Sequence, residues 1–221
     1  MALDERTRRL RNEIESNLGP DVMKTFIKDG HIYYALSQAQ RDVCMDALCV
    51  REQLELELEA GETDYPAAEN VHRIEEVVKP AAWSYSIEPK EPENWNVLIE
   101  QNLQCRQPLF VTILFGSYVF YPAPQEAQTV KLWLALKPSE DGSDDVDEET
   151  EPIVPASFDD ALILGATAKL LRKVPSKQLL DPERNEVYYM DLFNAEVEKR
   201  GSQTNRVQNR NPRSMREEFR F

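Results

Sequence analysis

Residues 53–60 read QLELELEA, in which leucine and glutamate alternate strictly. Alternation with a period of two places Leu54, Leu56 and Leu58 on one face of a strand and the glutamates on the other. A helix is the competing interpretation, because leucine and glutamate both favour helices. Since a helix would spread the leucines around its circumference, the stretch predicts a strand that is apolar on one face.

Helical periodicity precedes this strand. Apolar positions in residues 3–18 recur at helical spacing, and Gly19–Pro20 ends that helix. A short helix is expected over residues 22–28. The third and clearest helix covers residues 32–50, where apolar residues step by three and four. These residues are Ile32, Leu36, Ala39, Val43, Ala47 and Val50.

Further strands are expected after it, beyond a loop over residues 61–70. They cover residues 71–78, 83–87, 109–115, 118–121 and 129–136. Gly116 at the first turn position between two of these strands predicts a hairpin with a type II′ turn, and Pro122 ends the hairpin. Several short antiparallel strands between helical blocks indicate an α+β fold: a helical bundle with an inserted antiparallel β-rich region.

Two helices are expected after the strands. Ser157 is a plausible N-cap for the first, which Pro175 closes, and Asp181 and Pro182 open the second, which runs to Lys199. Residues 161–171 are apolar nearly all round, and their small side chains allow close backbone approach inside the domain or against a neighbouring subunit. The candidate contact residues are Leu162, Gly165, Ala166 and Lys169 here, with Leu36, Ala39 and Val43 on helix 32–50.

The chain has 221 residues, of which 41% are hydrophobic, enough for one domain with a sizeable core or one domain with an appendage. We expect a domain over residues 1–200, with helices over 3–50 and 157–199 and a β-rich insert over 53–137. An extended tail over 201–221 follows. The formal charge of -14 disfavours general binding to nucleic acid or to anionic membranes.

Residues 139–151 carry eight acidic residues and no basic one. Like charges at this density repel, so the segment predicts a solvated loop that serves as a flexible connector, with a docking surface for a basic partner as the alternative. It is rich in oxygen ligands, but it lacks the spacing of an EF-hand with its central glycine and terminal glutamate. A calcium site is therefore not expected.

The tail from Gly201 is basic, which sets it apart from the acidic body. It has no apolar face, and alone it should be disordered. Its arginines and terminal aromatic residues suit a segment that orders on a partner, either an acidic protein or DNA phosphate, and an unimportant frayed terminus is the alternative. The candidate binding residues are Arg206, Arg210, Arg213, Arg216, Phe219, Arg220 and Phe221.

No catalytic or metal-binding motif occurs in the sequence, and no cofactor is expected. His31 and His72 are expected at surface or capping positions. Cys44 and Cys49 lack the spacing of zinc ligands and are expected in the core. Three cysteines without a secretory signal indicate free thiols in a reducing compartment. The longest apolar run, residues 109–115, is far shorter than the roughly 20 residues of a membrane helix.

Several short motifs occur in a fixed order along the chain. RNEIESNLG (11–19) precedes ALSQAQRD (35–42), and a strand ends in FYPAP (120–124). IVP (153–155) then leads into ALILGATA (161–168), and a tyrosine-rich helix begins with VYY (187–189). In this order and spacing, the chain resembles the head-to-tail adaptor, or connector, proteins of tailed bacteriophages over residues from about 5 to 220.

The resemblance implies a structural virion protein rather than an enzyme. Such adaptors form a homo-oligomeric ring, commonly of twelve copies, beneath the portal protein. They extend the DNA channel and offer an attachment platform to the next neck or tail protein, and their C-terminal segments often grip the portal. The acidic loop has no counterpart in that pattern. Alternatives are a stopper-like or tail-completion protein and, from another class, an acidic regulatory or metal-binding protein.

Overall fold

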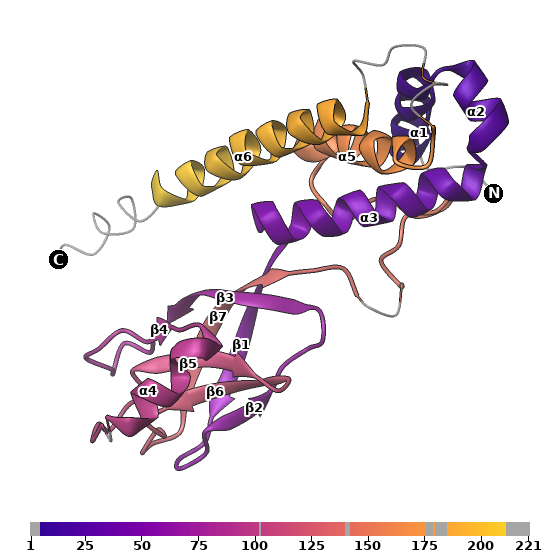
Figure 1. The fold of residues 1–221 in the computed structure, drawn as a ribbon. Coiled ribbons are helices and arrows are strands. Elements are labelled where there is room, and N and C mark those ends of the chain that lie inside the picture. The colour runs from indigo at the N-terminus through magenta and orange to yellow at the C-terminus, as the bar shows by residue number, and fades with distance from the viewer. Residues whose placement is uncertain (1–4, 102, 140–141, 176–178, 180–184, 211–221) are drawn as a thin grey trace. The chain divides into compact units, whose positions relative to one another are not determined.

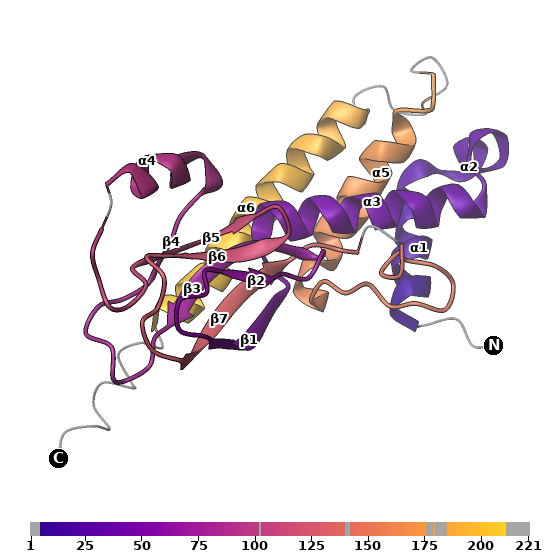
Figure 2. The same ribbon diagram turned by 90° about the horizontal axis from the view of Figure 1, so that it is seen from below.

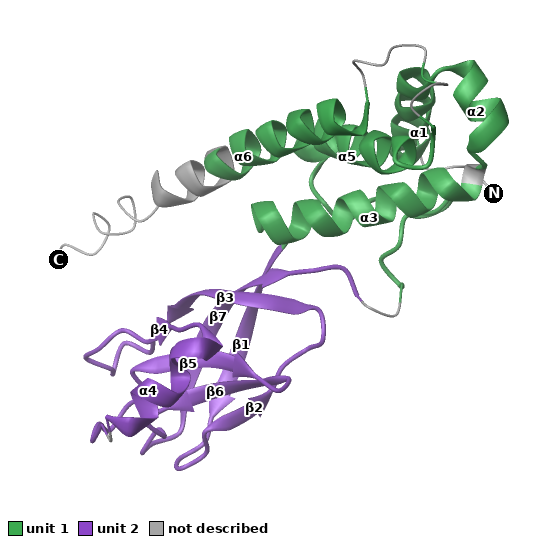
Figure 3. Cartoon of the chain, in the orientation of Figure 1, with its two compact units in different colours: residues 1–50, 141–221 green, residues 51–140 purple. Residues whose placement is uncertain are grey.

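The computed structural model describes residues 5–101, 103–139, 142–175, 179 and 185–210 (Figure 1). Of Asp29 and of residues 203–210 it describes the backbone alone. The chain divides into two compact units, one formed by residues 1–50 with 141–221 and the other by residues 51–140 (Figure 3). The first unit is helical and the second is built mainly of strands, so the fold is α+β.

The helical unit is organised around one buried helix. Its elements are α1 (Glu5–Leu18), α2 (Pro20–Phe26), α3 (Asp29–Ala47), the short 3-10 helix η2 (Ala156–Phe158), α5 (Asp159–Leu171) and α6 (Glu186–Arg210). Helix α5 packs against α1, α3 and α6, and lies alongside α6 in both views (Figures 1 and 2). Because α5 has neighbours on several sides, its apolar residues point nearly all round, as the sequence predicts.

The first three helices follow the predicted periodicity. Gly19, with a φ of 79°, separates α1 from α2, and Pro20 is the first residue of α2. Helix α3 ends at Ala47 rather than near Val50, because Leu48 takes a left-handed conformation and its N–H donates to the Cys44 carbonyl. The first strand begins at Arg51, three residues after Leu48.

The last two helices have boundaries that differ from the prediction. Ser157 lies in η2, and α5 begins at Asp159, with Asp160 also in its first turn as expected. Helix α5 ends at Leu171, before Pro175. Helix α6 is described from Glu186, so the predicted start at Asp181 and Pro182 lies outside the described residues.

The second unit contains two sheets. Its elements are β1 (Arg51–Leu58), β2 (Asp64–Pro66), β3 (Val71–Val78), β4 (Glu88–Pro89), η1 (Pro92–Asn94), α4 (Trp95–Glu100), β5 (Phe110–Leu114), β6 (Ser117–Tyr121) and β7 (Gln128–Leu136). One sheet has the order β1-β7-β3 and is antiparallel. The other has the order β2-β6-β5-β4, in which only the short β4–β5 pair is parallel.

The alternating segment forms a strand, as predicted. In β1, Leu54 lies opposite Leu132 and Leu56 lies opposite Val130 of β7. Leu58 is buried and the glutamates between the leucines are exposed. Burial of one face therefore decides the strand over the helix, although both residue types favour helices.

Residues 83–87 do not form the predicted strand. The Ser84 N–H donates to Oε1 of the buried Gln107 at 2.9 Å, and Gln107 Nε2 donates to the Tyr85 carbonyl at 2.8 Å. A side chain thus satisfies the backbone groups that a neighbouring strand would otherwise bond. The sequence prediction also missed β2, inside the expected loop 61–70, and helix α4.

The β5–β6 hairpin has a different turn from the one predicted. Leu114 pairs with Ser117, so Phe115 and Gly116 form the two-residue turn. Their φ angles are 49° and 76°, and two positive values define a type I′ turn, whereas type II′ needs a positive φ at the first position alone. Gly116 therefore occupies the second turn position.

Candidate functional site

The predicted contact residues of α3 and α5 lie in the core of the helical unit. Leu36, Ala39 and Val43 of α3 are fully buried, as are Leu162 and Ala166 of α5. Lys169 is partly exposed, and its Nζ lies 2.6 Å from Oδ2 of Asp42 on α3. The set therefore packs between helices of one chain, and its buried members leave no surface for a neighbouring subunit.

Gly165 explains the small side chains at this contact. A Cβ at this position would lie 2.9 Å from Phe193 Cδ2 on α6 and 3.1 Å from Ala39 Cβ on α3. These separations are shorter than van der Waals contact, so three helices converge on the backbone of one residue. Close packing inside the chain accounts for the glycine.

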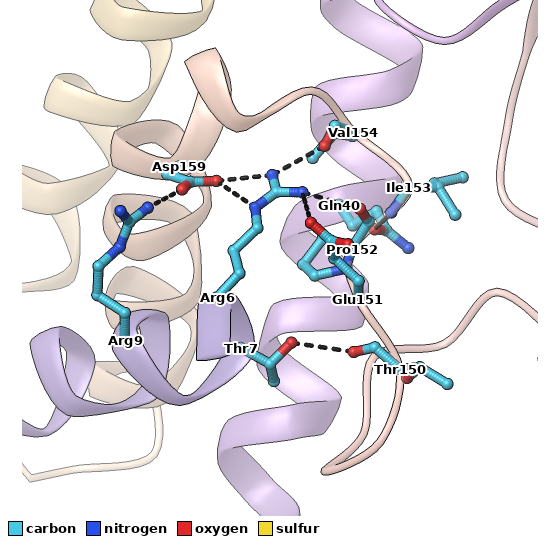
Figure 4. Close-up of polar contacts among 10 residues, drawn as sticks. All are labelled: Arg6, Thr7, Arg9, Gln40, Thr150, Glu151, Pro152, Ile153, Val154 and Asp159. Carbon is cyan, nitrogen blue, oxygen red and sulfur yellow. Dashed lines mark hydrogen bonds and ion pairs between the residues drawn. The ribbon is translucent and has the colours of Figure 1, made fainter. Parts of the chain in front are cut away.

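Arg6 joins two segments that lie far apart in the sequence, helix α1 and residues 152–159 (Figure 4). Its Nε and one terminal nitrogen donate to Asp159 Oδ1 at 2.9 and 2.7 Å, and Arg9 also donates to this carboxylate. The guanidinium further donates to the carbonyls of Pro152 at 3.1 Å and Val154 at 2.8 Å. The side chains of Arg6 and Asp159 are 13% and 8% exposed.

This arrangement fastens α1 to the first turn of α5 and to the chain that leads into it. Asp159 lies at the helix N-terminus, where a carboxylate is stabilised by the helix dipole. A guanidinium has five N–H donors and can make two bonds to the carboxylate and one to each carbonyl, whereas a lysine ammonium has only three donors. The cluster holds the bundle together and presents no open position for a substrate.

The middle of the acidic segment, residues 144–146, is packed on α3, which corrects the prediction of a flexible solvated connector there, whereas residues 147–149 are exposed as predicted. Val146 is buried, and its N–H donates to Ser37 Oγ at 2.9 Å. The fully buried Gln40 donates to the Asp144 carbonyl at 2.8 Å and accepts from the Ile153 N–H at 2.8 Å. Residues 140 and 141 lie outside the described part.

Helix α6 continues past its predicted end at Lys199 and runs through Arg210. The prediction of an unstructured segment from Gly201 is therefore wrong for residues 201–210. Gly201 is buried, with the place of a Cβ 3.6 Å from Ala47 Cα of α3. Arg206 and Arg210 belong to this helix by their backbone. The other predicted tail residues, Arg213, Arg216, Phe219, Arg220 and Phe221, lie outside the described residues.

Helix α6 carries apolar residues on a second face, which is exposed in the described part of the helical unit. Tyr189, Phe193 and Val197 are buried against the bundle, whereas Val187, Tyr188 and Leu192 are exposed. Beyond them, Arg200 hydrogen-bonds Glu196, and this bond lowers the pKa of the Glu196 carboxyl. The helix thus has one face for folding and another open to contact.

Within the described residues, the titratable side chains form no metal centre. No group of three or more histidine, cysteine, aspartate or glutamate side chains among them is placed to hold a metal ion. His31 accepts a hydrogen bond from the Lys28 N–H at 3.3 Å at the start of α3, which is a capping role. Hydrogen bonding to Cys49 and burial raise the pKa of Cys44, so its thiol is protonated.

The sequence comparison decides the family. Residues 1–216 match the family model of the SU10 adaptor protein. The chain belongs to this phage head-to-tail adaptor family. No curated protein matches the adaptor at a significant level. The family is a structural class rather than an enzyme class. In the described part of the adaptor, no helix is long and apolar enough to span a membrane.

Several features of the adaptor were missed from the sequence. The three-residue spacing of Arg6 and Arg9 on α1 was the available signal for the Asp159 cluster, but their partner lies about 150 residues away. Gln40 lies outside the apolar spacing of helix α3 and is nevertheless fully buried. Phe115, at the tip of the β5–β6 hairpin, was counted as part of a strand and is fully exposed.

Proposed function

We propose that this adaptor forms a homo-oligomeric ring of twelve copies that docks beneath the portal ring at the head–tail junction. The ring extends the DNA channel, lets DNA pass without sequence-specific binding, and offers an attachment platform to the next neck or tail protein. Assembly takes place in the host cytoplasm. Membership of the phage adaptor family supports this proposal.

The C-terminal segment is the proposed portal contact. The observation that carries this assignment is the course of α6: it continues for eight residues beyond Ser202, the last residue whose burial is described, into arginine-rich sequence. Residues 201–221 contain five arginines and two glutamates, whereas the rest of the chain is strongly acidic. A basic segment that ends in aromatic residues suits an acidic groove on a partner protein, because arginine pairs with carboxylates in a bidentate manner.

Repetition makes such a contact effective. A ring presents the same segment many times, so that modest single contacts add up once the first copies have docked. The acidic body suits a channel wall, because acidic surfaces gain no free energy from the release of DNA counterions. DNA can then slide past the ring without adhering to it.

Truncation of the C-terminal segment tests the docking role. A chain that ends at Ser202 keeps the packed Gly201 and removes all five arginines of the segment. We expect it to melt as the full chain does and to lose binding to the portal ring from the same genome. The measurement is the particle mass after mixing, at protein concentrations where the full chain saturates the portal.

A charge variant serves as the matched control for length. Replacement of Arg206, Arg210, Arg213, Arg216 and Arg220 by glutamine keeps the chain length and removes the positive charge. We expect at least a tenfold loss of portal affinity, because charged hydrogen bonds at an interface contribute more than about 1.4 kcal/mol in sum. Normal docking of the truncated chain would contradict the assignment. Binding to a tail tube instead of a portal would favour a tail-completion protein.

A further inference from the structure

The tip of the β5–β6 hairpin carries no charge. It consists of Leu114–Ser117 and of the neighbouring segment Pro66–Ala68, which is held beside the turn by a hydrogen bond of 2.9 Å from the Ala67 N–H to the Gly116 carbonyl. At its end stands Phe115, whose side chain is fully exposed. We refer to these seven residues as the hairpin tip.

Phe115 is costly for the isolated unit in two ways. Its φ of 49° lies in the left-handed region, which disfavours a residue with a Cβ and which asparagine and glycine tolerate best in a type I′ turn. Its ring also remains in water and gains no burial. Since neither the turn nor the core of the unit benefits from a phenylalanine, the benefit lies in contact with another molecule.

A second apolar surface lies at the opposite end of the same hairpin. The ring of Tyr121 packs edge-on against Trp95 of α4 with centroids 6.2 Å apart. Its hydroxyl donates to the Ile99 carbonyl at 3.3 Å and accepts from the Leu103 N–H at 3.0 Å. These contacts fix α4 beside Tyr121, which pairs with Phe110, the first residue of β5.

The α4 patch consists of Val97 and Ile99 of α4, which are 60% and 48% exposed. The ladder runs from the Phe110–Tyr121 pair to the Leu114–Ser117 pair, four residues apart, so about 14 Å of strand separates the α4 patch from the hairpin tip.

Charge restricts where two copies of this unit can meet. Residues 51–140 contain 15 acidic and 7 basic residues, a formal charge of -8, so two copies repel each other over most of their surface. The hairpin tip escapes this repulsion because none of its residues is charged. An apolar tip placed on an apolar patch adds no like-charge contact and buries an aromatic ring.

We propose that the hairpin tip of one copy packs onto the α4 patch of the next copy. This inference rests on the proposed ring, for which it names the contact between β units. Because the two surfaces differ and lie at opposite ends of one hairpin, each copy uses both once. Such a head-to-tail contact continues from copy to copy, as a ring requires, and it closes where the rotation between copies returns to the first one, whereas a contact between two tips would stop at a dimer.

Cysteine cross-linking tests this contact directly. In a Cys105→Ser background, Phe115→Cys protein and Val97→Cys protein are mixed on the portal ring and treated with a short bis-maleimide. We expect cross-linked dimers from the mixture and a ladder up to the whole ring from the doubly substituted protein. Val78→Cys, on the other sheet, replaces Val97→Cys as the control and gives no dimers. Rings without any cross-link, or dimers from Phe115→Cys alone, would overturn the proposal.

Assembly of a polar-tip variant gives a second, independent readout. We expect Phe115→Asn to need about tenfold more protein than the wild type to fill the portal by half, since loss of a central aromatic anchor has effects of this size. Val78→Asn, at an exposed position on the other sheet, should assemble normally. If Phe115→Asn filled the portal normally but lost the next tail component, that component would be the partner of the tip and the proposal would be wrong.

The tests separate this contact from the ring itself. If wild-type protein does not bind the portal at all, the proposed function fails. The two single-cysteine proteins mixed at high concentration without portal then decide the contact. Cross-linked dimers would support it, and their absence would overturn it together with the ring.

Discussion

The α3–α5 contact and the β5–β6 hairpin tip use side-chain size in opposite ways. At Gly165 the absence of a side chain lets three helices meet, and nothing of the residue is left for a partner. At Phe115 a large aromatic side chain stands in water on a backbone conformation that suits asparagine or glycine. Glycine at position 165 favours folding, whereas phenylalanine at position 115 does not. Residues that help folding and residues that help assembly can thus be told apart by what each would gain from replacement.

The largest effect is expected when a side chain is added at Gly165, where α3, α5 and α6 meet. We expect Gly165→Val to destabilise the protein by about 3 kcal/mol, because its side chain would overlap Phe193 and Ala39 in a close-packed site. Chemical denaturation measures the loss. Gly30→Ala is the control, since nothing lies within 4 Å of the place of its Cβ. Equal stabilities for the two variants would refute the packing argument.

The Arg6 cluster tests whether folding contacts of this unit depend on polar groups as well. Arg6→Ala leaves Asp159 and two carbonyls without their shared donor, so we expect a loss of about 2 kcal/mol. Arg9→Ala removes a side chain that is 57% exposed and should lose less than about 1 kcal/mol. The ratio of the two losses, measured by urea unfolding, is the test. A larger loss for Arg9→Ala would contradict the assigned roles.

The hairpin tip should respond in the opposite direction. Phe115→Asn relieves an unfavourable turn residue, and we expect a gain in stability of about 0.5–1 kcal/mol. Phe115→Ala is the matched variant, because it removes the ring but keeps a side chain that disfavours a positive φ. Thermal unfolding of the two variants separates turn strain from exposure of the ring. A drop in stability for Phe115→Asn would show that Phe115 serves the fold after all.

The smallest expected effect concerns the ion pair of Glu196 and Arg200 on α6. The hydrogen bond from Arg200 lowers the pKa of Glu196 in the folded protein. A lowered folded-state pKa stabilises the protein above the unfolded pKa, and this stability disappears as the pH falls through the folded pKa. The free energy of unfolding of the wild type should therefore be higher than that of Glu196→Gln at pH 7, by less than about 0.5 kcal/mol, and this difference should vanish in acid. Melting curves from pH 7 to pH 3 would show a constant difference if the pair were unimportant.

Features that depend on local periodicity could be predicted from the sequence. The alternation in residues 53–60 and the three-and-four spacing from Ile32 to Ala47 each encode one buried face, and these elements formed as expected. The family also followed from the order of short motifs.

Features that depend on distant partners could not be predicted in this way. The aromatic residues at 83–87 suggested a strand, but Gln107 satisfies their backbone instead. The turn type required the pairing of Leu114 with Ser117, which decides that Phe115 and not Ser117 is a turn residue. Helix α6 extends beyond the end of its apolar periodicity. A helix that has already formed can propagate through polar sequence, because propagation costs less free energy than nucleation.

We propose that this adaptor builds a ring on a portal, and the mass of the assembled particle tests this proposal most directly. Purified full-length protein is mixed in excess with portal rings from the same genome, and the mass gained per portal is recorded. Twelve copies of 25.5 kDa add about 306 kDa in a single step, which imaging should show as a second ring at one end of the portal. No gain in mass on intact portals would contradict the account.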